Sequence, residues 1–147
     1  MNGEIYIVDD NSDHHFLLYR ILKQLPEFYS VKFFEDGRIL HRHLDTLLIQ
    51  EQYDKFPKLI ILDLNMPGMS GLQLLKLLKN PVKQSHEYLK NIPVVVMSSD
   101  VSEDKMLKCY KEGADAYIIK PIEFDKIKST MQSICRFWIG REVSSVE

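Results

Sequence analysis

The chain has 147 residues, of which 27% are charged, and its 21 acidic side chains slightly outnumber its 19 basic ones. This length suits one domain, because a single core of this size buries most of its apolar surface. The net charge of −2 argues against a protein that binds the nucleic-acid backbone, which requires a basic excess. The only cysteines, Cys109 and Cys135, form neither a disulfide framework nor a CxxC zinc motif.

The sequence carries no targeting or membrane signal. The apolar run at residues 5–8 is short, and no basic segment precedes it, so it is not a secretory signal. No stretch approaches the roughly 18 apolar residues that a membrane-spanning helix requires. We therefore expect a soluble protein of the cytoplasm.

Five short apolar runs alternate with longer amphipathic stretches. The runs cover residues 5–8 (IYIV), 31–34 (VKFF), 59–62 (LIIL), 94–97 (VVVM) and 116–119 (AYII). Three of them are almost wholly apolar and β-branched, which is typical of strands covered on both faces in a parallel sheet. The second run contains Lys32, which predicts a more exposed strand at an edge of the sheet.

Apolar residues also recur at helical spacing in the segments that follow these runs. The five stripes are Leu18, Ile21, Leu22 and Leu25; Leu40, Leu44, Leu47 and Leu48; Leu74, Leu77 and Leu78; Met106, Leu107 and Tyr110; and Ile127, Met131, Ile134 and Trp138. Asn11, Ser70 and Ser102 precede three of them and are good helix N-caps. We interpret the stripes as the core-facing sides of five helices.

Strands that alternate with helices predict βαβ units with right-handed crossovers. The expected fold is an α/β, doubly wound, three-layer sandwich around a parallel sheet. Ligands of such folds bind at the carboxyl ends of the strands. The residues directly after each apolar run are therefore the first candidates for function.

Polar side chains follow four of the five runs. Asp9 and Asp10 follow the first, Asp63 the third, Ser98 and Ser99 the fourth, and Lys120 and Pro121 the fifth. A parallel sheet brings these groups to one edge. Each alone has a structural explanation, such as a helix cap, so the argument depends on their combination.

The combination favours phosphoryl transfer. Three crowded carboxylates resist ionisation unless a cation compensates, and oxygen ligands without His or Cys indicate Mg²⁺. Magnesium takes one or two carboxylates, which leaves another free to react. A lysine and a hydroxyl suit the oxygens of a phosphoryl group. The chemistry implied is transfer of a phosphoryl group to an aspartate.

These residues resemble the receiver domain of two-component response regulators, the family that includes the single-domain chemotaxis regulator. The likeness spans Glu4 to about Trp138. The matching positions are the acidic pair Asp9 and Asp10, the phosphoacceptor Asp63 in IILDLNMPGMSG with Pro67 and Gly71, the switch hydroxyl Ser98, the switch aromatic Tyr117 and the lysine Lys120. The resemblance implies a flavodoxin-like sheet of strand order 2-1-3-4-5 with five helices. It also implies a receiver domain over residues 1–139 and a short tail over 140–147, with no output domain.

The resemblance further implies how the metal is held and where the phosphoryl group goes. Asp10 and Asp63 contact Mg²⁺ directly, as does the backbone carbonyl of Asn65, and Asp9 acts through a bound water. A sensor histidine kinase or a histidine phosphotransfer protein donates the phosphoryl group to Asp63, while Lys120 offsets its charge. Such a domain is a phosphoacceptor and not a turnover enzyme.

Phosphorylation is then expected to shift a two-state equilibrium. Ser98 turns toward the phosphate, and Tyr117 follows from an outward to a buried rotamer. The face formed by the fourth helix, fifth strand and fifth helix changes, and it signals by protein–protein contact, which includes homodimer formation. Onward transfer of the phosphoryl group to a histidine phosphotransfer protein is the alternative output, and the sequence does not separate the two. In the family the Lys120–Pro121 bond is cis, whereas an unspecified X-Pro bond is cis in about 5–6% of cases. Asn65 and Asp100 both stand where a side chain polarises water, which predicts phosphate loss that is not unusually slow.

Three alternatives stay open. A Mg²⁺-dependent phosphohydrolase also uses an aspartyl nucleophile, but it normally has a second aspartate two residues on, where this chain has Asn65. A flavin-binding module of the same topology requires a Ser/Thr-Gly-rich phosphate loop, which does not follow the first apolar run. An unphosphorylated scaffold receiver is disfavoured by the complete set of site residues.

Three further features have no assigned role. The connection from Asn80 to Asn91 exceeds the usual length between a helix and a strand, and we interpret it as a tolerated insertion in preference to an interaction surface. The apolar end of the last helix, around Trp138, either associates with another chain or packs on its own domain. The histidines are expected to be solvated and not to bind metal, because close neighbours on a helix do not face one another. They are His14, His15, His41, His43 and His86.

Overall fold

The buried apolar runs form the strands of one parallel sheet. The computed structural model describes residues 3–66 and 68–140, so Pro67 and the tail beyond residue 140 lie outside the described residues. The strands are β1 (Gly3–Val8), β2 (Tyr29–Phe34), β3 (Leu59–Leu62), β4 (Val94–Ser98) and β5 (Ala116–Ile119). Their spatial order is β2-β1-β3-β4-β5. The predicted strand order and the edge position of the second strand are confirmed.

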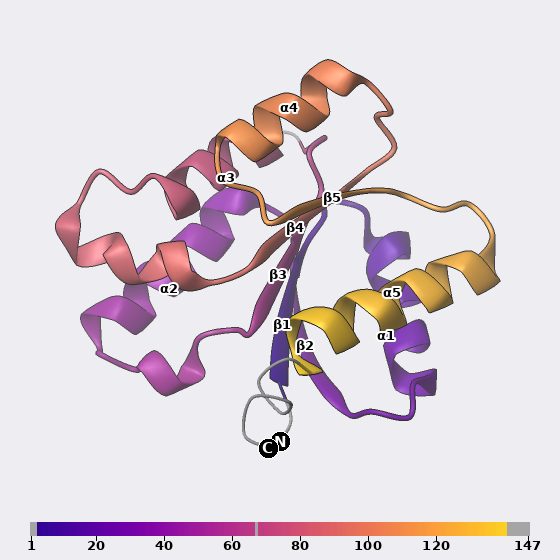
Figure 1. The fold of residues 1–147 in the computed structure, drawn as a ribbon. Helices are drawn as coiled ribbons and strands as arrows, with labels where there is room; N and C mark the ends of the chain where they lie inside the picture. The colour runs from indigo at the N-terminus through magenta and orange to yellow at the C-terminus, as the bar shows by residue number, and fades with distance from the viewer. Residues whose placement is uncertain (1–2, 67, 141–147) are drawn as a thin grey trace.

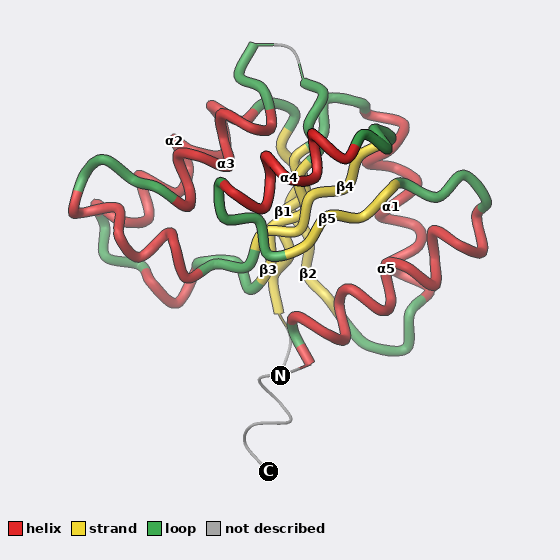
Figure 2. The backbone as a smooth tube through the Cα atoms, turned by 45° about the horizontal axis from the view of Figure 1, so that its top comes forward, coloured by secondary structure: helices red, strands yellow, loops and turns green. Residues whose placement is uncertain are grey.

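Helices cover both faces of the sheet, as Figure 1 and Figure 2 show. The helices α1 (Ser12–Gln24) and α5 (Phe124–Trp138) lie on one face, and α2 (Gly37–Ile49), α3 (Gly71–Lys79) and α4 (Glu103–Lys111) lie on the other. Two 3₁₀ helices, η1 (Tyr53–Lys55) and η2 (Gln84–Asn91), pack beside α2. The predicted doubly wound sandwich is therefore confirmed. No helix among residues 3–66 and 68–140 has the length and apolar character to cross a bilayer.

Side-chain caps fix where the helices begin. Asn11 Oδ1 accepts a hydrogen bond from the backbone N–H of Asp13 at 2.9 Å, which starts α1 directly after the end of β1. Ser70 and Gln73 form a reciprocal capping box at the start of α3. Ser102 Oγ accepts the third N–H of α4 at 3.1 Å. All three predicted caps are confirmed.

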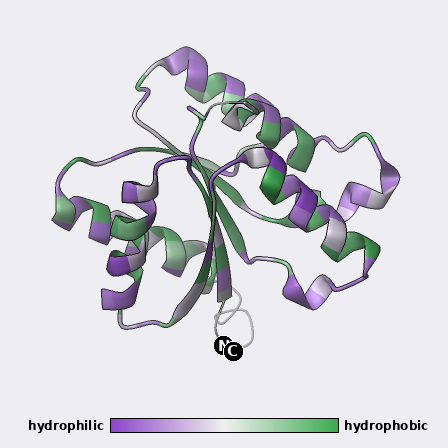
Figure 3. Ribbon diagram, turned by 180° about the vertical axis from the view of Figure 1, so that it is seen from behind, coloured by the Kyte–Doolittle hydropathy of each residue, from purple (hydrophilic) through white to green (hydrophobic). Residues whose placement is uncertain are grey.

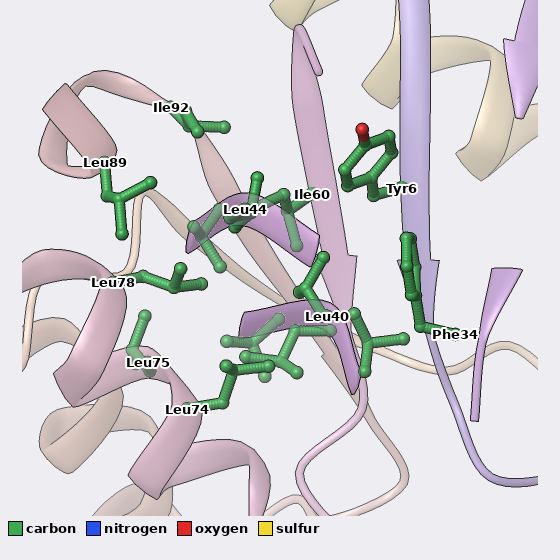
Figure 4. Packing of buried hydrophobic residues seen from close by; sticks show 14 of the residues in the cluster. Tyr6, Phe34, Leu40, Leu44, Ile60, Leu74, Leu75, Leu78, Leu89 and Ile92 are labelled. Atoms are coloured by element: carbon green, nitrogen blue, oxygen red, sulfur yellow. The ribbon is translucent and has the colours of Figure 1, made fainter. Parts of the chain in front are cut away.

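The core consists of two layers, one on each face of the sheet. Successive residues of β1 alternate between them, so that Tyr6 faces α2 and α3 while Ile7 faces α1 and α5. Figure 4 shows the first layer, in which leucines of α2 and α3 meet Ile60 of β3 and Tyr6. Figure 3 shows mainly hydrophobic strands and helices in which hydrophobic and hydrophilic residues are mixed. β3 and β4 are buried along their full length, as their apolar runs predict.

The predicted apolar face of α4 is confirmed for Met106 and wrong for Leu107 and Tyr110. Leu107 is 61% exposed and Tyr110 is half-exposed, whereas Cys109 is 1% exposed. The helix turns Met106 and Cys109, three residues apart, toward the core. The short helix has one narrow buried stripe, and hydrophobicity alone did not identify it. The Tyr110 hydroxyl instead accepts a hydrogen bond from the backbone N–H of Tyr117 at 3.0 Å.

The connection between α3 and β4 packs on the core and on α2, while its interpretation as a tolerated insertion stays a prediction. Within η2, Leu89 is fully buried in the core. His86 is buried as well, and its Nε2 lies 2.6 Å from Asp45 Oδ1 of α2. The Tyr88 ring contacts Phe56 beside η1. The expectation that all the histidines are solvated is therefore wrong. The hydrogen bond to the Asp45 carboxylate offsets the free-energy cost of burying the polar His86 ring.

The end of α5 packs on its own domain. Trp138 lies against the core layer under α1 and α5, and Ile139 is buried there. Phe137 is exposed and its ring meets Trp138 edge to face at 4.8 Å between centroids. Of the two interpretations of this segment, packing on the domain therefore applies to Trp138 and Ile139.

Lys79 joins three segments at the amino-terminal end of the sheet. Its Nζ donates to the backbone carbonyls of Ile92 at 2.7 Å and Lys90 at 3.1 Å. It also pairs with Asp115 Oδ2 at 2.9 Å, and the lysine side chain is only 9% exposed. Asp115 Oδ2 in turn accepts the backbone N–H of Val94 at 2.8 Å. One ammonium therefore connects α3, the start of β4 and the turn before β5.

We expect Lys79→Met to lower the free energy of unfolding by about 1–3 kcal/mol, because it leaves two backbone carbonyls and the partly exposed carboxylate of Asp115 without their charged donor. Denaturant titration measures this. Lys76→Met is the matched control, since Lys76 is exposed and its nitrogen lies 3.8 Å from Glu112; its effect should stay within about 0.5 kcal/mol. Equal effects of the two substitutions would contradict this role of Lys79.

Candidate functional site

The predicted site residues meet at the carboxyl ends of the strands. Asp9 follows β1, Asp63 follows β3 and Lys120 follows β5, while Ser98 is the last residue of β4. Backbone hydrogen bonds continue just past the strand ends: the Asp63 N–H donates to Val8 O at 3.0 Å, and the Lys120 N–H donates to Ser98 O at 2.9 Å. The sheet itself therefore sets the spacing of these side chains.

Asp9, Asp10 and Asp63 form a carboxylate cluster. One oxygen from each lies within 4.8 Å of the others, and no other group of three His, Cys, Asp or Glu side chains in the described residues meets this condition. Asp9 and Asp63 are buried, whereas Asp10 is exposed to solvent. Oxygen ligands of this kind, open to water on one side, fit a hard divalent cation. The histidines form no such cluster in the part of the chain that the structure describes.

Lys120 provides the nearest positive charge. Its Nζ lies 3.2 Å from Asp63 Oδ2 and 3.5 Å from Asp9 Oδ2. One ammonium thus serves two buried carboxylates, so the cluster keeps an excess of negative charge. An additional cation, or the oxygens of a phosphoryl group next to the lysine, would complete the charge pattern.

The environment of Asp63 opposes its ionised form. Burial raises the pKa of this carboxyl group above its ordinary value, and the charge of Asp9 adds to the rise. Lys120 and the backbone N–H of Asn65, which donates to Oδ1 at 3.2 Å, act in the opposite direction. Since the net pKa shift is upward, the surroundings disfavour the ionised form of Asp63, and a bound cation would favour it.

Gly71 permits the chain to pass close to Asp63. A Cβ atom at this position would lie 2.6 Å from Leu64 Cα and would also meet the carbonyl oxygen of Asp63. The Gly71 N–H donates to Leu64 O at 3.0 Å. Only glycine fits here, because the first turn of α3 packs directly on the backbone that carries Asp63.

Ser98 and Tyr117 lie beside this cluster and share a partner. Ser98 is buried, and its Oγ accepts the backbone N–H of Asp100 at 3.1 Å. The Tyr117 ring is buried, and its hydroxyl donates to the carbonyl of Asp100 at 2.7 Å; burial raises the pKa of this phenol. The structure therefore holds Tyr117 in the buried position of the expected equilibrium. Asp100 Oδ1 accepts the Ser102 N–H at 2.8 Å before α4, so the water-polarising role of Asp100 stays a prediction.

The expected cis bond before Pro121 is wrong. No cis peptide bond occurs in residues 3–66 and 68–140, so the Lys120–Pro121 bond is trans. The trans isomer of an X-Pro bond is ordinarily the more stable by about 0.5–1 kcal/mol, and Lys120 reaches both carboxylates with it.

Two histidines in the first turn of α1 were missed as parts of the site. His14 Nδ1 lies 3.0 Å from Asp9 Oδ2, and His15 Nε2 forms a hydrogen bond to the backbone carbonyl of Asp9. Their sequence position, directly after a cap that follows the acidic pair, was the available signal. A helix points the side chains of its first turn back toward its amino end, which here is the end of β1.

Comparison with known proteins shows the family. A model of the response regulator receiver domain matches residues 5–132, and the chain belongs to this family. It is 36% identical over 118 residues to the two-component response regulator ORR3 of Oryza sativa subsp. indica, covering 80% of this chain and 79% of ORR3. Several other matched regulators are longer, and the chain spans only 16–35% of their length.

Solved structures show the same fold. The phosphorylated cyanobacterial phytochrome response regulator RcpA superposes with a TM-score of 0.76 at 26% identity, covering 95% of both chains. The Mn²⁺-bound form of response regulator Rcp1 gives a TM-score of 0.71 at 28% identity, covering 92% of this chain and 94% of the other. The protein is thus a two-component response regulator receiver, a class of signalling phosphoacceptors.

Without divalent cations, we expect Asp63→Asn to unfold at the same or a higher denaturant concentration than the wild type. The raised pKa means that the ionised carboxylate costs stability above that pKa, and the amide removes this cost. In Mg²⁺ at 100 times the dissociation constant, binding should add about 2.7 kcal/mol to the wild type, and the order should reverse. Urea titrations with and without Mg²⁺ test this; a variant that is strongly less stable in both conditions would contradict it.

Proposed function

We propose that the protein accepts a phosphoryl group on Asp63 and signals by protein–protein contact. The main observation in support is that Lys120 contacts Asp63 within the carboxylate cluster of Asp9, Asp10 and Asp63. The donor is the phosphohistidine of a sensor kinase or of a phosphotransfer protein. We take residues 1–139 as the receiver domain and 140–147 as a tail.

Mg²⁺ is the proposed cofactor. Asp10 and Asp63 would bind it directly together with the backbone carbonyl of Asn65, and Asp9 would contact it through a water. The oxygen-only cluster supports this assignment, as does the similar structure of response regulator Rcp1 in its Mn²⁺-bound form. When bound, the ion offsets the negative charge of the phosphoryl oxygens.

The residues of this chain carry the chemistry. A carboxylate oxygen of Asp63 attacks the phosphorus atom, the bond to the donor nitrogen breaks, and an acyl phosphate forms. Lys120, already 3.2 Å from Asp63, would neutralise one phosphoryl oxygen. The similar structure of RcpA is phosphorylated, which supports this reaction. The protein returns to its starting state by hydrolysis and is not a turnover enzyme.

The output would arise at α4, β5 and α5. Ser98 would bond to the new phosphate and thereby change the surroundings of Tyr117, which lies on β5 behind α4. Exposed apolar side chains on this face support a partner surface; they are Val101, Leu107, Tyr110, Ile119 and Phe124. A homodimer formed through this face, or through the end of α5, is part of the proposal as one form of contact.

The donor would dock over the site. Phe16 of α1 and Ile122, which is 95% exposed in the loop after β5, present apolar side chains on the elements that carry the site residues. A helical donor with an apolar face would cover them and bring its histidine to Asp63. We also propose a cytoplasmic location, which the free thiols of Cys109 and Cys135 support.

The phosphohydrolase alternative is less well supported. Its second acid would stand where this chain has Asn65, and the structure gives that position a backbone hydrogen bond to Asp63. The scaffold alternative does not account for a complete cluster with a lysine in contact. Flavin binding is not supported either, because Asp9 and Asp10 follow β1 in place of a Ser/Thr-Gly-rich phosphate loop.

Acetyl phosphate with Mg²⁺ should add one phosphate to the intact mass of the protein. Asp63→Asn should abolish the adduct, because it removes the attacking carboxylate. Asp54→Asn is the matched control, since Asp54 lies exposed in η1, and it should label like the wild type. No adduct on the wild type, or equal labelling of Asp63→Asn, would sink the proposal.

The phosphate should not persist for many hours in the presence of Mg²⁺. Asn65 and Asp100 are placed beside Asp63 and Ser98 respectively, where a polar side chain can orient an attacking water. The decay of the adduct, followed by mass spectrometry after removal of acetyl phosphate, measures the lifetime. A lifetime of many hours would show that neither residue performs this role.

A further inference from the structure

The carboxylate of Asp9 faces three hydrogen-bond donors, two of them from residues outside the carboxylate cluster and its lysine. Its Oδ1 accepts the backbone N–H of Asn11 at 2.9 Å. Its Oδ2 faces two donors, His14 Nδ1 at 3.0 Å and Lys120 Nζ at 3.5 Å. A carboxylate so constrained has little freedom to rotate, and the imidazole is the closer of the two groups at Oδ2.

The start of α1 places the imidazole. Asn11 Oδ1 caps the helix and also accepts the backbone N–H of His14 at 3.3 Å. The neighbouring His15 hydrogen-bonds the Asp9 carbonyl and stacks on Phe33 of β2 with ring centroids 4.7 Å apart. The first turn of α1 is thereby fixed to the ends of β1 and β2, and the His14 side chain is directed at Asp9.

We propose that His14 is a positioning residue for phosphorylation: its Nδ1–H fixes Asp9 and keeps Lys120 on Asp63. This rests on the proposed function of Asp63. A carboxylate only accepts hydrogen bonds, so the ring nitrogen that faces it carries a proton in the neutral as well as in the charged imidazole. The hydrogen bond, and not the charge of the ring, is what the role requires.

The distances show how the lysine is shared. Lys120 Nζ lies closer to Asp63, at 3.2 Å, than to Asp9, at 3.5 Å. Without His14, Oδ2 of Asp9 would lose its closest donor and attract the ammonium more strongly. Lys120 would then move from Asp63, where it is needed to offset the charge of the phosphoryl group, and Asp9 would turn from the place of its metal-bound water.

Three substitutions distinguish an effect of the His14–Asp9 hydrogen bond from an effect of side-chain packing at position 14. His14→Leu fills the space without a donor. His14→Asn offers its amide Nδ2–H₂ to Asp9 Oδ2 from the position of Nδ1, so it restores a hydrogen-bond donor without a titratable ring. Ser12→Ala, at an exposed position on the same turn, is the control. Thermal melting of each variant shows whether the domain stays folded.

The experiment measures two quantities with acetyl phosphate as the donor. They are the Mg²⁺ dissociation constant, from calorimetry, and the rate of adduct formation at saturating Mg²⁺, from intact mass. We expect His14→Leu to lose about tenfold in affinity or rate, which is typical when a partner of a metal-site carboxylate is removed, with an unchanged melting temperature in metal-free buffer. His14→Asn should recover most of the loss, and Ser12→Ala should match the wild type.

Unchanged affinity and rate in folded His14→Leu would overturn the proposal, as would a His14→Asn protein no better than His14→Leu. A loss in Ser12→Ala equal to that in His14→Leu would also overturn it, because the effect would then belong to the helix start in general. If the wild-type protein takes up no phosphate on Asp63, the proposed function fails instead. The calorimetric Mg²⁺ affinities then still decide the role of His14 at Asp9.

Discussion

The crowding of three carboxylates at one end of a parallel sheet is the constraint on which the rest of the site depends. Asp9 and Asp63 are buried and share a single ammonium, so their negative charge is only partly balanced within the chain. In the proposed function, a cation and a phosphoryl group would supply what is lacking, which would explain why a stable apolar fold keeps such an unfavourable cluster. Gly71 and the cap of α1 serve the same end, because they allow backbone and helix to approach the acids closely.

At the amino-terminal ends of the strands, a different set of contacts stabilises the sheet. There Lys79 binds two carbonyls and Asp115, and η2 fills the gap between α2 and β4 with Leu89 and His86. These groups are satisfied without any ligand. The molecule therefore has one end held by Lys79 and η2 and an opposite end that is open and charged, so the groups that stabilise the fold and the groups of the site lie at opposite ends of the strands.

Much of this was predictable because the strands are encoded locally. Four-residue apolar runs gave the strands, and the polar residues after them gave the cluster, since parallel pairing brings strand ends together. The side of α4 that faces the core was not predictable, because Leu107 and Cys109 differ in burial for reasons of packing and not of hydrophobicity. The roles of His14 and His86 depend on contacts with acids of other elements, Asp9 after β1 and Asp45 of α2, which spacing along one helix does not reveal. The isomer of the Lys120–Pro121 bond likewise depends on the surrounding structure.

The central claim is that this electrostatic arrangement directs a phosphoryl group to one particular oxygen-bearing residue. The most direct measurement is to phosphorylate the protein with acetyl phosphate and Mg²⁺, reduce the acyl phosphate with borohydride, and locate the altered residue by tandem mass spectrometry. The account predicts that Asp63 alone is altered. Modification of Asp9, Asp10 or any other residue in place of Asp63, or no modification at all, would contradict it.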